Sequence, residues 1–390
     1  MRSLTWQNVW AERLARHSLL DRTPAEGLVD LVGAVCGIHA QVMIAAELSI
    51  GIQVDDVTRR DVQAALWEKR DLVKTFGIRG TLHLFPSKEL PLWMAALRAR
   101  AALDPKRYES IGLDRRELQA ILKAMAESLD GRQLTIKQLG ERVVEHAGSW
   151  AGETTSQAWN GAWPRWRKAL GEAAINGILC YGPPQGTEVT FVRADQWTGN
   201  SDDADPEEAL AEVFRRYLRA YGPATTRDFA QWFNIPPRAA RDLGAALADE
   251  LEQVDVEGYR SYALAGDFGG AADTVAADFH EEMPVRLLPH FDCYVIGCHP
   301  RNLLLPPDWS ERVPPRTIPS QLQTLLIDGT VAGVWERQTK GRRVEVRVEP
   351  FMSLDERQKR LLEEEACRIG NIMEMEATLA IGPVAVRPHL

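Results

Sequence analysis

The stretch ATTRDFAQWFNIPPRAARDLGAALADELEQVDVEGYRSYAL, residues Ala224 to Leu264, carries the clearest secondary-structure pattern in the chain. Thr225 or Thr226 can cap a short helix, because a side-chain oxygen just before a helix accepts from its first free N–H groups. NIPP then predicts a turn, a second helix follows, and EGYR predicts the tight turn of a β-hairpin. Helix, turn, helix and two-stranded wing is the pattern of a winged helix.

A similar pattern, a helix followed by a hairpin, occurs twice more, nearer the N-terminus. One copy is DVQAALWEKRDLVKTFGIRGTLHLF, and the other is LTIKQLGERVVEH followed by AWPRWRKALGEAAINGILCYGPPQGTEVTFV. Three successive copies favour a repeat architecture, and the alternative is a general α+β protein with helix–hairpin units. We therefore predict an α+β fold with tandem winged-helix units over residues 1–110, 111–200 and 201–284.

After Pro284 the pattern changes to strands joined by tight turns. VRLLPHFDCYVIGC, TLLIDGTVAGVWERQ and GRRVEVRVEPF predict strands, with hairpin turns at DGT and TKGR. LDERQKRLLEEEACRIGNIM predicts a helix before a last short strand. We predict a small, β-rich and barrel-like C-terminal domain over residues 285–390.

The composition limits the classes of function. With 46 Lys and Arg against 55 Asp and Glu, the net charge of −9 argues against a general polyanion binder. It leaves room for DNA binding through one basic face, because the acidic residues cluster in SDDADPEEALAE, Ser201 to Glu212. No apolar run approaches the ~20 residues that span a bilayer. The charged N-terminus and five scattered cysteines lead us to expect a cytoplasmic protein with free thiols and no membrane partner.

The apolar stretch GIHAQVMIAAELSIGI, Gly37 to Ile52, contains two polar side chains, His39 and Gln41. On a helix, residues two apart point roughly 200° away from each other, whereas on an extended segment they share a face. Gly37 lowers helix propensity and is a plausible point of interruption. The residues alone leave two alternatives open: a satisfied polar pair in a core, or a pair that binds one ligand.

Two further segments could contact DNA. On an alternating strand, one face of GIRGTLHLFP would carry Arg79, Thr81 and His83. The hairpin VWERQTKGRRVEVRV gathers four cations around one turn: Arg337, Lys340, Arg342 and Arg343. Both sets suit contacts with phosphates, and each has the alternative of an ordinary solvated face or turn.

Metal and cofactor signals are weak. HFDCYVIGCH contains His290, Cys293, Cys298 and His299, but on a strand they would divide between opposite faces, and a paired CxxC is missing. We predict no metal site. The chain has no GxGxxG, GxxxxGK[ST], HExxH or GxSxG motif, so nucleotide hydrolysis, hydride transfer and α/β-hydrolase chemistry have no support, and we expect no cofactor.

Together these residues resemble the AlkZ-like bacterial DNA glycosylases, over nearly the whole chain. The resemblance rests on the tandem winged helices, on a (Gln/His)-apolar-Gln pair here formed by His39-Ala40-Gln41, on RGTLHLFP, and on a terminal β domain with LLPHFD and GTVAGVW. A sister branch, the YcaQ-like enzymes, has Gln-apolar-Asp at the same place. The first position of this pair is glutamine in one form of the AlkZ-like pattern and histidine, His39, in this chain. The difference bears on how the site would bind and activate a water molecule.

The resemblance implies a C-shaped scaffold that holds double-stranded DNA and hydrolyses the N-glycosidic bond of alkylated bases. The expected substrates are bulky N7-alkylguanine adducts of natural-product genotoxins, in self-resistance or base excision repair, with interstrand crosslinks as a further possibility. His39 and Gln41 would be catalytic, and we expect a monofunctional, monomeric enzyme. The alternatives are a winged-helix transcription regulator and a catalytically silent DNA-binding relative.

Overall fold

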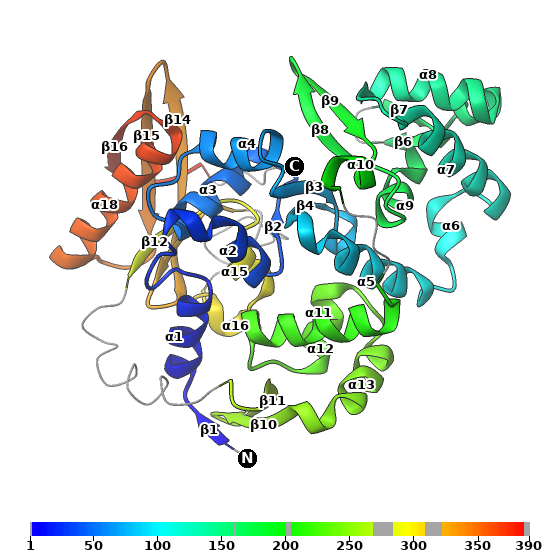
Figure 1. Ribbon diagram of the computed structural model, residues 1–390. Coiled ribbons are helices and arrows are strands. Elements are labelled where there is room, and N and C mark those ends of the chain that lie inside the picture. The colour runs from blue at the N-terminus through cyan, green and yellow to red at the C-terminus, as the bar shows by residue number, and fades with distance from the viewer. Residues whose placement is uncertain (1, 159–160, 200–203, 268–283, 309–321, 386–390) are drawn as a thin grey trace. The chain divides into compact units, whose positions relative to one another are not determined.

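Residues 2–158, 161–199, 204–267, 284–308 and 322–385 are described by a computed structural model of the chain (Figure 1). The chain separates into two units by its internal contacts. Unit 1 contains Met1–Gln63, Phe214–Phe233 and Pro237–Leu390, and unit 2 contains Ala64–Val213 and Asn234–Pro236. Helices and small, mainly antiparallel sheets make up both units, so the predicted α+β class is confirmed.

In unit 1, the segment that begins at Ala224 folds in the predicted order. Thr225 is the capping residue: its Oγ1 accepts from the backbone N–H of Asp228 at 3.1 Å, and Asp228 Oδ2 accepts from the N–H of Thr225 at 2.8 Å. Glu257 and Gly258 have φ of +51° and +92° and form the predicted hairpin turn. The elements are α12 (Thr226–Phe233), α13 (Pro237–Ala246), β10 (Leu251–Val256) and β11 (Tyr259–Leu264).

The N-terminal part of unit 1 begins with a strand that the sequence analysis did not predict. β1 pairs in parallel with β10, so residues near the start of the chain complete the sheet of the β10–β11 hairpin. The charged N-terminus forms the helix α1, which buries Val9 and Leu14 completely. The elements of this part are β1 (Arg2–Leu4), α1 (Trp6–Arg16), α2 (Leu28–Ala34), β2 (Ile38–His39), α3 (Met43–Gln53) and the start of α4 (Arg59–Trp67), whose residues from Ala64 on belong to unit 2.

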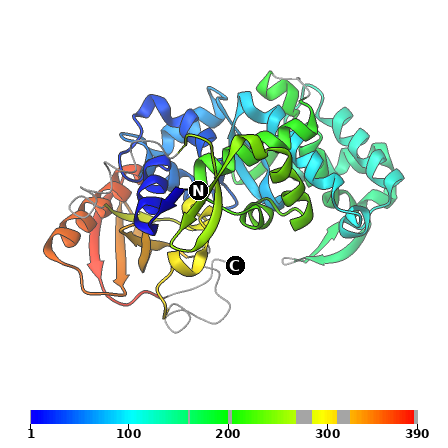
Figure 2. The same ribbon diagram turned by 90° about the horizontal axis from the view of Figure 1, so that it is seen from below.

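The C-terminal part of unit 1 is a five-stranded sheet in the order β12-β13-β14-β15-β16, with β12 and β16 at its edges. Neighbouring strands are antiparallel except for the parallel pair β15–β16. Helix α18 packs against β12 and β16 (Figure 2). The elements are β12 (Val285–Leu288), α15 (Cys293–Gly297), α16 (Arg301–Leu304), β13 (Thr324–Ile327), β14 (Thr330–Lys340), β15 (Arg343–Pro350), α18 (Glu356–Met373) and β16 (Glu376–Ile381).

One predicted strand in this part is wrong. VRLLPHFDCYVIGC is a strand only to Leu288, and the chain then turns into the short helix α15. The reason is local, because the Asp292 side chain accepts from the N–H of Tyr294 and caps the helix. The argument that His290, Cys293, Cys298 and His299 alternate on a strand therefore does not apply.

Unit 2 has two further helix–hairpin segments. β3 and β4 form one antiparallel hairpin, and β8 and β9 form another that is extended by β5. Its core includes Ile121, Met125, Leu139 and Trp166. The elements are β3 (Leu72–Phe76), β4 (Leu82–Pro86), α5 (Leu90–Ala102), α6 (Arg107–Ile111), α7 (Arg115–Leu129), β5 (Leu134–Thr135), α8 (Ile136–Ala147), β6 (Thr154–Ala158), β7 (Gly161–Pro164), α9 (Leu170–Ile175), β8 (Cys180–Gln185), β9 (Glu188–Val192) and α10 (Ala194–Thr198).

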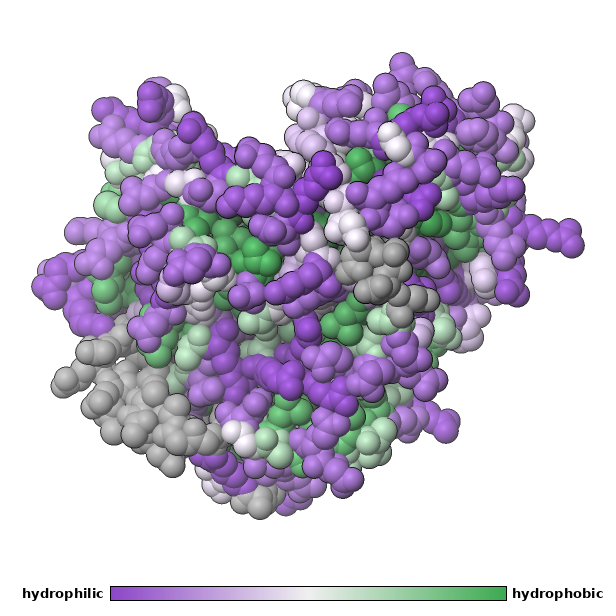
Figure 3. Space-filling model, in the orientation of Figure 1, coloured by the Kyte–Doolittle hydropathy of each residue, from purple (hydrophilic) through white to green (hydrophobic). Residues whose placement is uncertain are grey.

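Helix α11 (Pro206–Tyr221) begins within the acidic cluster Ser201 to Glu212, and residues 201–203 of that cluster lie outside the described residues. The face seen in Figure 3 is mostly hydrophilic, and its hydrophobic residues form small separate patches. Among the described residues, no helix combines the length and the hydropathy needed to cross a membrane.

Candidate functional site

The segment that carries His39 and Gln41 is extended, which is one of the two conformations that the sequence left open. Cys36 and Gly37 both have positive φ, +65° and +88°, and this pair reverses the chain after α2. His39 then lies in the two-residue strand β2, and α3 begins only at Met43. The predicted interruption at Gly37 is thereby confirmed, and neither His39 nor Gln41 belongs to a helix.

The two side chains have different surroundings. His39 is 7% exposed, and its ring stacks on that of Phe291 with the centroids 4.6 Å apart and the planes at 24°. Gln41 is exposed. Phe291 has φ of +61°, a backbone region that costs a bulky residue roughly 1–3 kcal/mol. A histidine and a carboxamide thus lie two residues apart in the chain, the first buried and the second at the surface.

Phe291 is followed by a buried carboxylate that links two parts of unit 1. Asp292 is 1% exposed, and its Oδ2 accepts from Ser49 Oγ of α3 at 2.7 Å. Its Oδ1 accepts from the N–H of Tyr294 at 3.0 Å. Burial raises the pKa of Asp292 to about 6, and these two hydrogen bonds oppose the shift.

A buried polar cluster extends behind this carboxylate. Cys293 Sγ lies 3.7 Å from His17 Nδ1 and 3.8 Å from Gln53 Nε2. The His17 ring packs against the rings of Tyr221 and Tyr294, with centroids 5.0 and 5.5 Å away. His17 is fully buried, and burial lowers its pKa to about 3.

The pKa of His17 makes stability depend on pH. In the unfolded chain the imidazole has a pKa near 6.5, so it binds a proton as the pH falls below about 6.5. In the folded protein it stays neutral down to about pH 3. Between these two pH values His17 therefore lowers the free energy of unfolding as the pH falls. We expect the difference in unfolding free energy between the wild type and His17→Phe to change by roughly 2 kcal/mol between pH 6.5 and 5. Urea unfolding at both pH values measures it.

Asp292 acts in the opposite direction between about pH 4 and 6, but it is present in both proteins and cancels in the comparison. His146→Gln is the matched control, because His146 is exposed on α8 and should leave the pH dependence unchanged. An unchanged difference for His17→Phe would mean that His17 is not held neutral.

A second buried carboxylate, Glu47, lies on α3, the helix that follows Gln41, and it connects this helix to the basic hairpin β14–β15. Glu47 is 1% exposed and accepts from Arg59 Nε and, at 2.8 Å, from Gln63 Nε2. Arg337 of β14, which pairs with Val346 three residues before the turn, belongs to the same cluster. Burial lowers the pKa of Arg337, the neighbouring charge of Arg59 lowers it further, and Glu47 opposes the shift. Arg337 therefore stands in an ionic cluster, and not at the exposed tip.

The tip of the hairpin β14–β15 is basic and exposed, as predicted. Lys340 and Arg342 lie at the turn, and Arg343 pairs with Glu376 of β16 at 2.9 Å. Further down the hairpin, Arg337 and Trp335 line a cavity of about 260 Å³ together with His290, the residue before Phe291. The stacking partner of His39 is thus next in sequence to a residue of this cavity.

The prediction that Arg79, Thr81 and His83 share one face of a strand is wrong. Arg79 has φ of +57° and lies with Gly80 in the turn between β3 and β4, so the strand alternation does not extend through it. Thr81 Oγ1 donates to the carbonyl of Ile78 at 3.0 Å. His83 is on β4 but is only 4% exposed, and its Nδ1 lies 3.0 Å from the carbonyl of Thr81.

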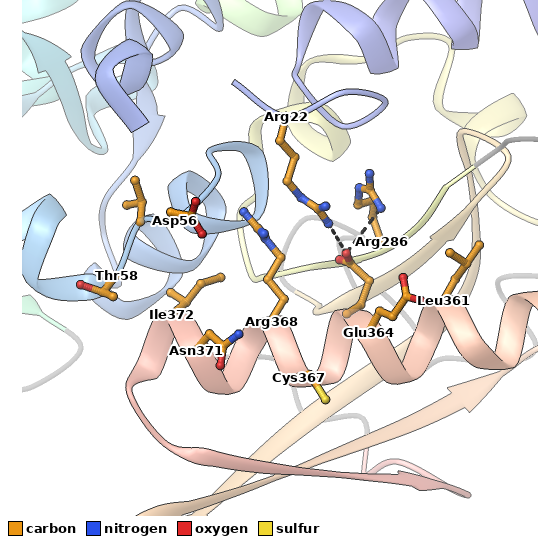
Figure 4. A pocket seen from close by; sticks show the side chains of 12 residues that line it. Arg22, Asp56, Thr58, Arg286, Leu361, Glu364, Cys367, Arg368, Asn371 and Ile372 are labelled. Atoms are coloured by element: carbon orange, nitrogen blue, oxygen red, sulfur yellow. Dashed lines mark hydrogen bonds and ion pairs between the residues drawn. The ribbon is translucent and has the colours of Figure 1, made fainter. Parts of the chain in front are cut away.

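The other end of α3 is fixed by an arginine-rich network around a cavity of about 580 Å³ (Figure 4). Arg22 and Arg368 donate to carbonyls at the C-terminal end of α3, those of Ile52 and Gly51, each at 3.0 Å. Arg22 and Arg286 both donate to the buried carboxylate of Glu365 on α18. Burial lowers the pKa of Arg286 to about 10, and Glu365 opposes the shift. The network holds α3 on α18.

Within the described residues, no group of three or more His, Cys, Asp or Glu side chains could hold a metal ion. His290 lines the cavity at the hairpin, whereas Cys293 contacts His17, so the sequence HFDCYVIGCH does not gather its donors at one point.

Sequence reasoning missed Phe291, Asp292 and Glu47. Glu47 could have been noticed as the one carboxylate in the apolar run VMIAAELSIGI. Phe291 and Asp292 lie in the stretch LLPHFD that was interpreted as a strand, and a strand gives no reason to single out a left-handed Phe and a capping Asp.

Three comparisons with known proteins identify the same family, and each match covers most of the chain. The model of the family "DNA glycosylase AlkZ-like" matches residues 32–372. A Streptomyces sahachiroi protein named interstrand DNA cross-link repair glycosylase is 30% identical over 374 residues, which cover 94% of this chain and 96% of that protein. The structure of Streptomyces sahachiroi DNA glycosylase AlkZ matches with a TM-score of 0.78 and 27% identity, covering 98% of this chain and all of that one. The chain belongs to the AlkZ-like family of DNA glycosylases.

Proposed function

We propose that this DNA glycosylase removes bulky N7-alkylguanine adducts from double-stranded DNA, and that it unhooks interstrand crosslinks, as the name of its Streptomyces sahachiroi relative suggests. The observation that carries the proposal is the placement of His39 and Gln41 on an extended segment, with His39 stacked on Phe291. A producer of a DNA-alkylating metabolite would need such an enzyme for self-resistance.

The chemistry requires little from the protein. Alkylation at N7 leaves a positive charge on guanine, so the base is already a good leaving group. What remains is to place a water molecule at the sugar carbon and to accept its proton. In our proposal Gln41 orients the water through its amide oxygen, and His39 accepts the proton. The pair lacks a lysine nucleophile, so we propose a monofunctional hydrolase without a lyase step.

We further propose that the helix–hairpin segments are three winged-helix units, over residues 1–110, 111–200 and 201–284, that hold the duplex in a C-shaped arrangement, with residues 285–390 as the β-rich domain. We propose that the enzyme acts as a monomer. Arg79 and Thr81 in the β3–β4 turn and Lys340 and Arg342 at the hairpin tip are the proposed phosphate contacts. We do not assign DNA contact to His83, because its side chain is buried.

The test is base release. Duplexes that carry a single N7-methylguanine, a bulky N7-alkylguanine or a crosslink are incubated with the protein and treated with mild alkali, which cleaves the strand at abasic sites. We expect cleavage with the bulky adduct and the crosslink. Release of N7-methylguanine alone would contradict the proposed substrate class. Tight DNA binding without any release would favour a regulator or a silent relative.

The hairpin tip gives a separate prediction. Replacing Lys340 and Arg342 by alanine should weaken binding to all DNA sequences and reduce the slope of log K against log salt by roughly 2, since each phosphate contact contributes about 0.9. Arg343 is left in place because it pairs with Glu376. Fluorescence anisotropy between low and moderate salt measures the slope.

Lys359→Ala is the matched control for the hairpin variant, because Lys359 is an exposed cation of α18 that pairs with Glu356. We expect it to leave the slope unchanged. If the double variant and the control have the same slope as the wild type, the hairpin tip does not contact phosphates.

A further inference from the structure

The conformation of Phe291 is unusual for its residue type. Among the described residues with positive φ, Phe291 is the only aromatic one, and the others are small, polar or charged apart from glycine. A bulky side chain stays in this region only where its surroundings hold it there. Such strain is concentrated at functional sites, and the ring it orients here is the one that stacks on His39.

The surroundings that hold Phe291 come from Asp292. One carboxylate oxygen of Asp292 caps α15 through the N–H of Tyr294, and the other accepts from Ser49 Oγ at 2.7 Å. Both hydrogen bonds are buried. Removal of the Ser49 hydroxyl or of the Asp292 carboxylate would therefore leave a polar atom in the core without its hydrogen-bond partner. The residue next to Phe291 is therefore fixed at two points.

Ser49 places this fixation on the same helix that follows the catalytic segment. Helix α3 begins two residues after Gln41, and Ser49 lies within it. The Phe291–Asp292 pair thus contacts the N-terminal segment of unit 1 twice, through the ring of His39 and through the hydroxyl of Ser49. Two contacts fix both the position and the direction of the Phe291 ring relative to that segment.

The stack limits what the imidazole can do. Rotation of a histidine ring about its last side-chain bond is broad and soft, so an unsupported ring would sample many orientations. Phe291 covers one face of the ring at 4.6 Å and leaves its nitrogen-bearing edges for polar contacts. A proton acceptor needs its nitrogen within hydrogen-bond reach of water, and that reach depends on the plane of the ring.

We propose that Phe291 is a positioning residue for His39, and that Asp292 and Ser49 hold Phe291 in the strained conformation from which it fixes the plane of the imidazole. The proposal deepens the proposed function, because it rests on His39 acting on water. Phe291 contacts neither water nor DNA in this role, and its effect passes entirely through His39.

The first experiment measures base release under single-turnover conditions from a bulky N7-alkylguanine duplex. Phe291→Leu keeps an apolar side chain but removes the stack, and we expect its rate to fall on the order of 10²-fold with unchanged DNA affinity. Phe291→Tyr keeps the ring and should restore most of the lost rate. Ser49→Ala should lower the rate less than Phe291→Leu. Tyr108→Leu, at a 41% exposed aromatic residue of α6, controls for loss of a ring elsewhere.

The second experiment does not depend on activity. In protein with ¹³C,¹⁵N-labelled histidine, the ring protons of His39 are assigned by their loss in His39→Ala. Their signals should be shifted upfield by the Phe291 ring. The shift should vanish in Phe291→Leu and persist in Phe291→Tyr. Thermal unfolding of each variant shows whether it is folded.

The outcomes separate the two proposals. A folded Phe291→Leu that releases base at the wild-type rate overturns the positioning role. So does an upfield shift that survives in Phe291→Leu. If the wild type releases no base but the shift behaves as expected, the proposed substrate fails while the contact between the two rings stands. Equal loss of rate in Phe291→Leu and Phe291→Tyr would mean that Phe291 acts by packing at that site alone.

Discussion

His39→Ala and Gln41→Ala are each expected to slow the single-turnover release of an N7-alkylguanine by roughly 10²–10⁴-fold, the range that a general acid or base contributes. The physical reason is that both side chains act on one water molecule in our proposal, one as its orienting partner and the other as its proton acceptor. Affinity for undamaged DNA should change little, because neither substitution removes a cation.

The double variant sharpens this expectation. Groups that act as a unit are strongly non-additive, so His39→Ala with Gln41→Ala should lose little more than the slower single variant. His146→Ala, at an exposed histidine of α8, is the matched control and should keep the wild-type rate. If both single variants retained full activity, the assignment of the site would be wrong, although the family membership would be unaffected.

Glu365→Ala is expected to lower the free energy of unfolding by roughly 3–5 kcal/mol, the usual effect of removing one partner from a buried ion pair. Glu365 is 3% exposed and accepts from two guanidinium groups, those of Arg22 and Arg286. Arg286 has only 8% of its side chain exposed, so without the carboxylate its charge would be left in the interior. Urea unfolding followed by circular dichroism measures the loss.

Glu364→Ala is the matched control for this stability prediction. Glu364 is the preceding residue on α18 and is exposed, so its removal should change the unfolding free energy by no more than about 0.5 kcal/mol. Similar losses in the two variants would show that the buried carboxylate does not stabilise the arginine network.

The sequence predicts those parts of the fold whose signals are local. The cap at Thr225, the turn at Glu257 and Gly258 and the helix before β16 all follow from neighbouring residues, and each was placed within a few positions. Strand β1 could not be predicted in this way, because its partner β10 lies some 250 residues further along the chain.

The site shows the same division. His39 and Gln41 stand out as polar residues in an apolar run, and Gly37 indicates that the helix is interrupted there. Alternation misplaced Arg79, Thr81 and His83, because the left-handed turn at Arg79 breaks the two-residue period. Phe291 and Asp292 acquire their meaning only from Ser49 and His39, which no local pattern connects to them.

The discontinuity of unit 1 has a consequence for the protein during its synthesis. Unit 1 begins with residues 1–63, continues with 214–233 and is completed only by residues 237–390, after all of unit 2 has been made. At about 5–20 residues per second, the ribosome reaches Phe291 roughly 12–50 s after it has added His39. Until then the nascent chain carries the histidine without the ring that covers it. A truncated polypeptide that ends before residue 291 never acquires the ring that covers His39.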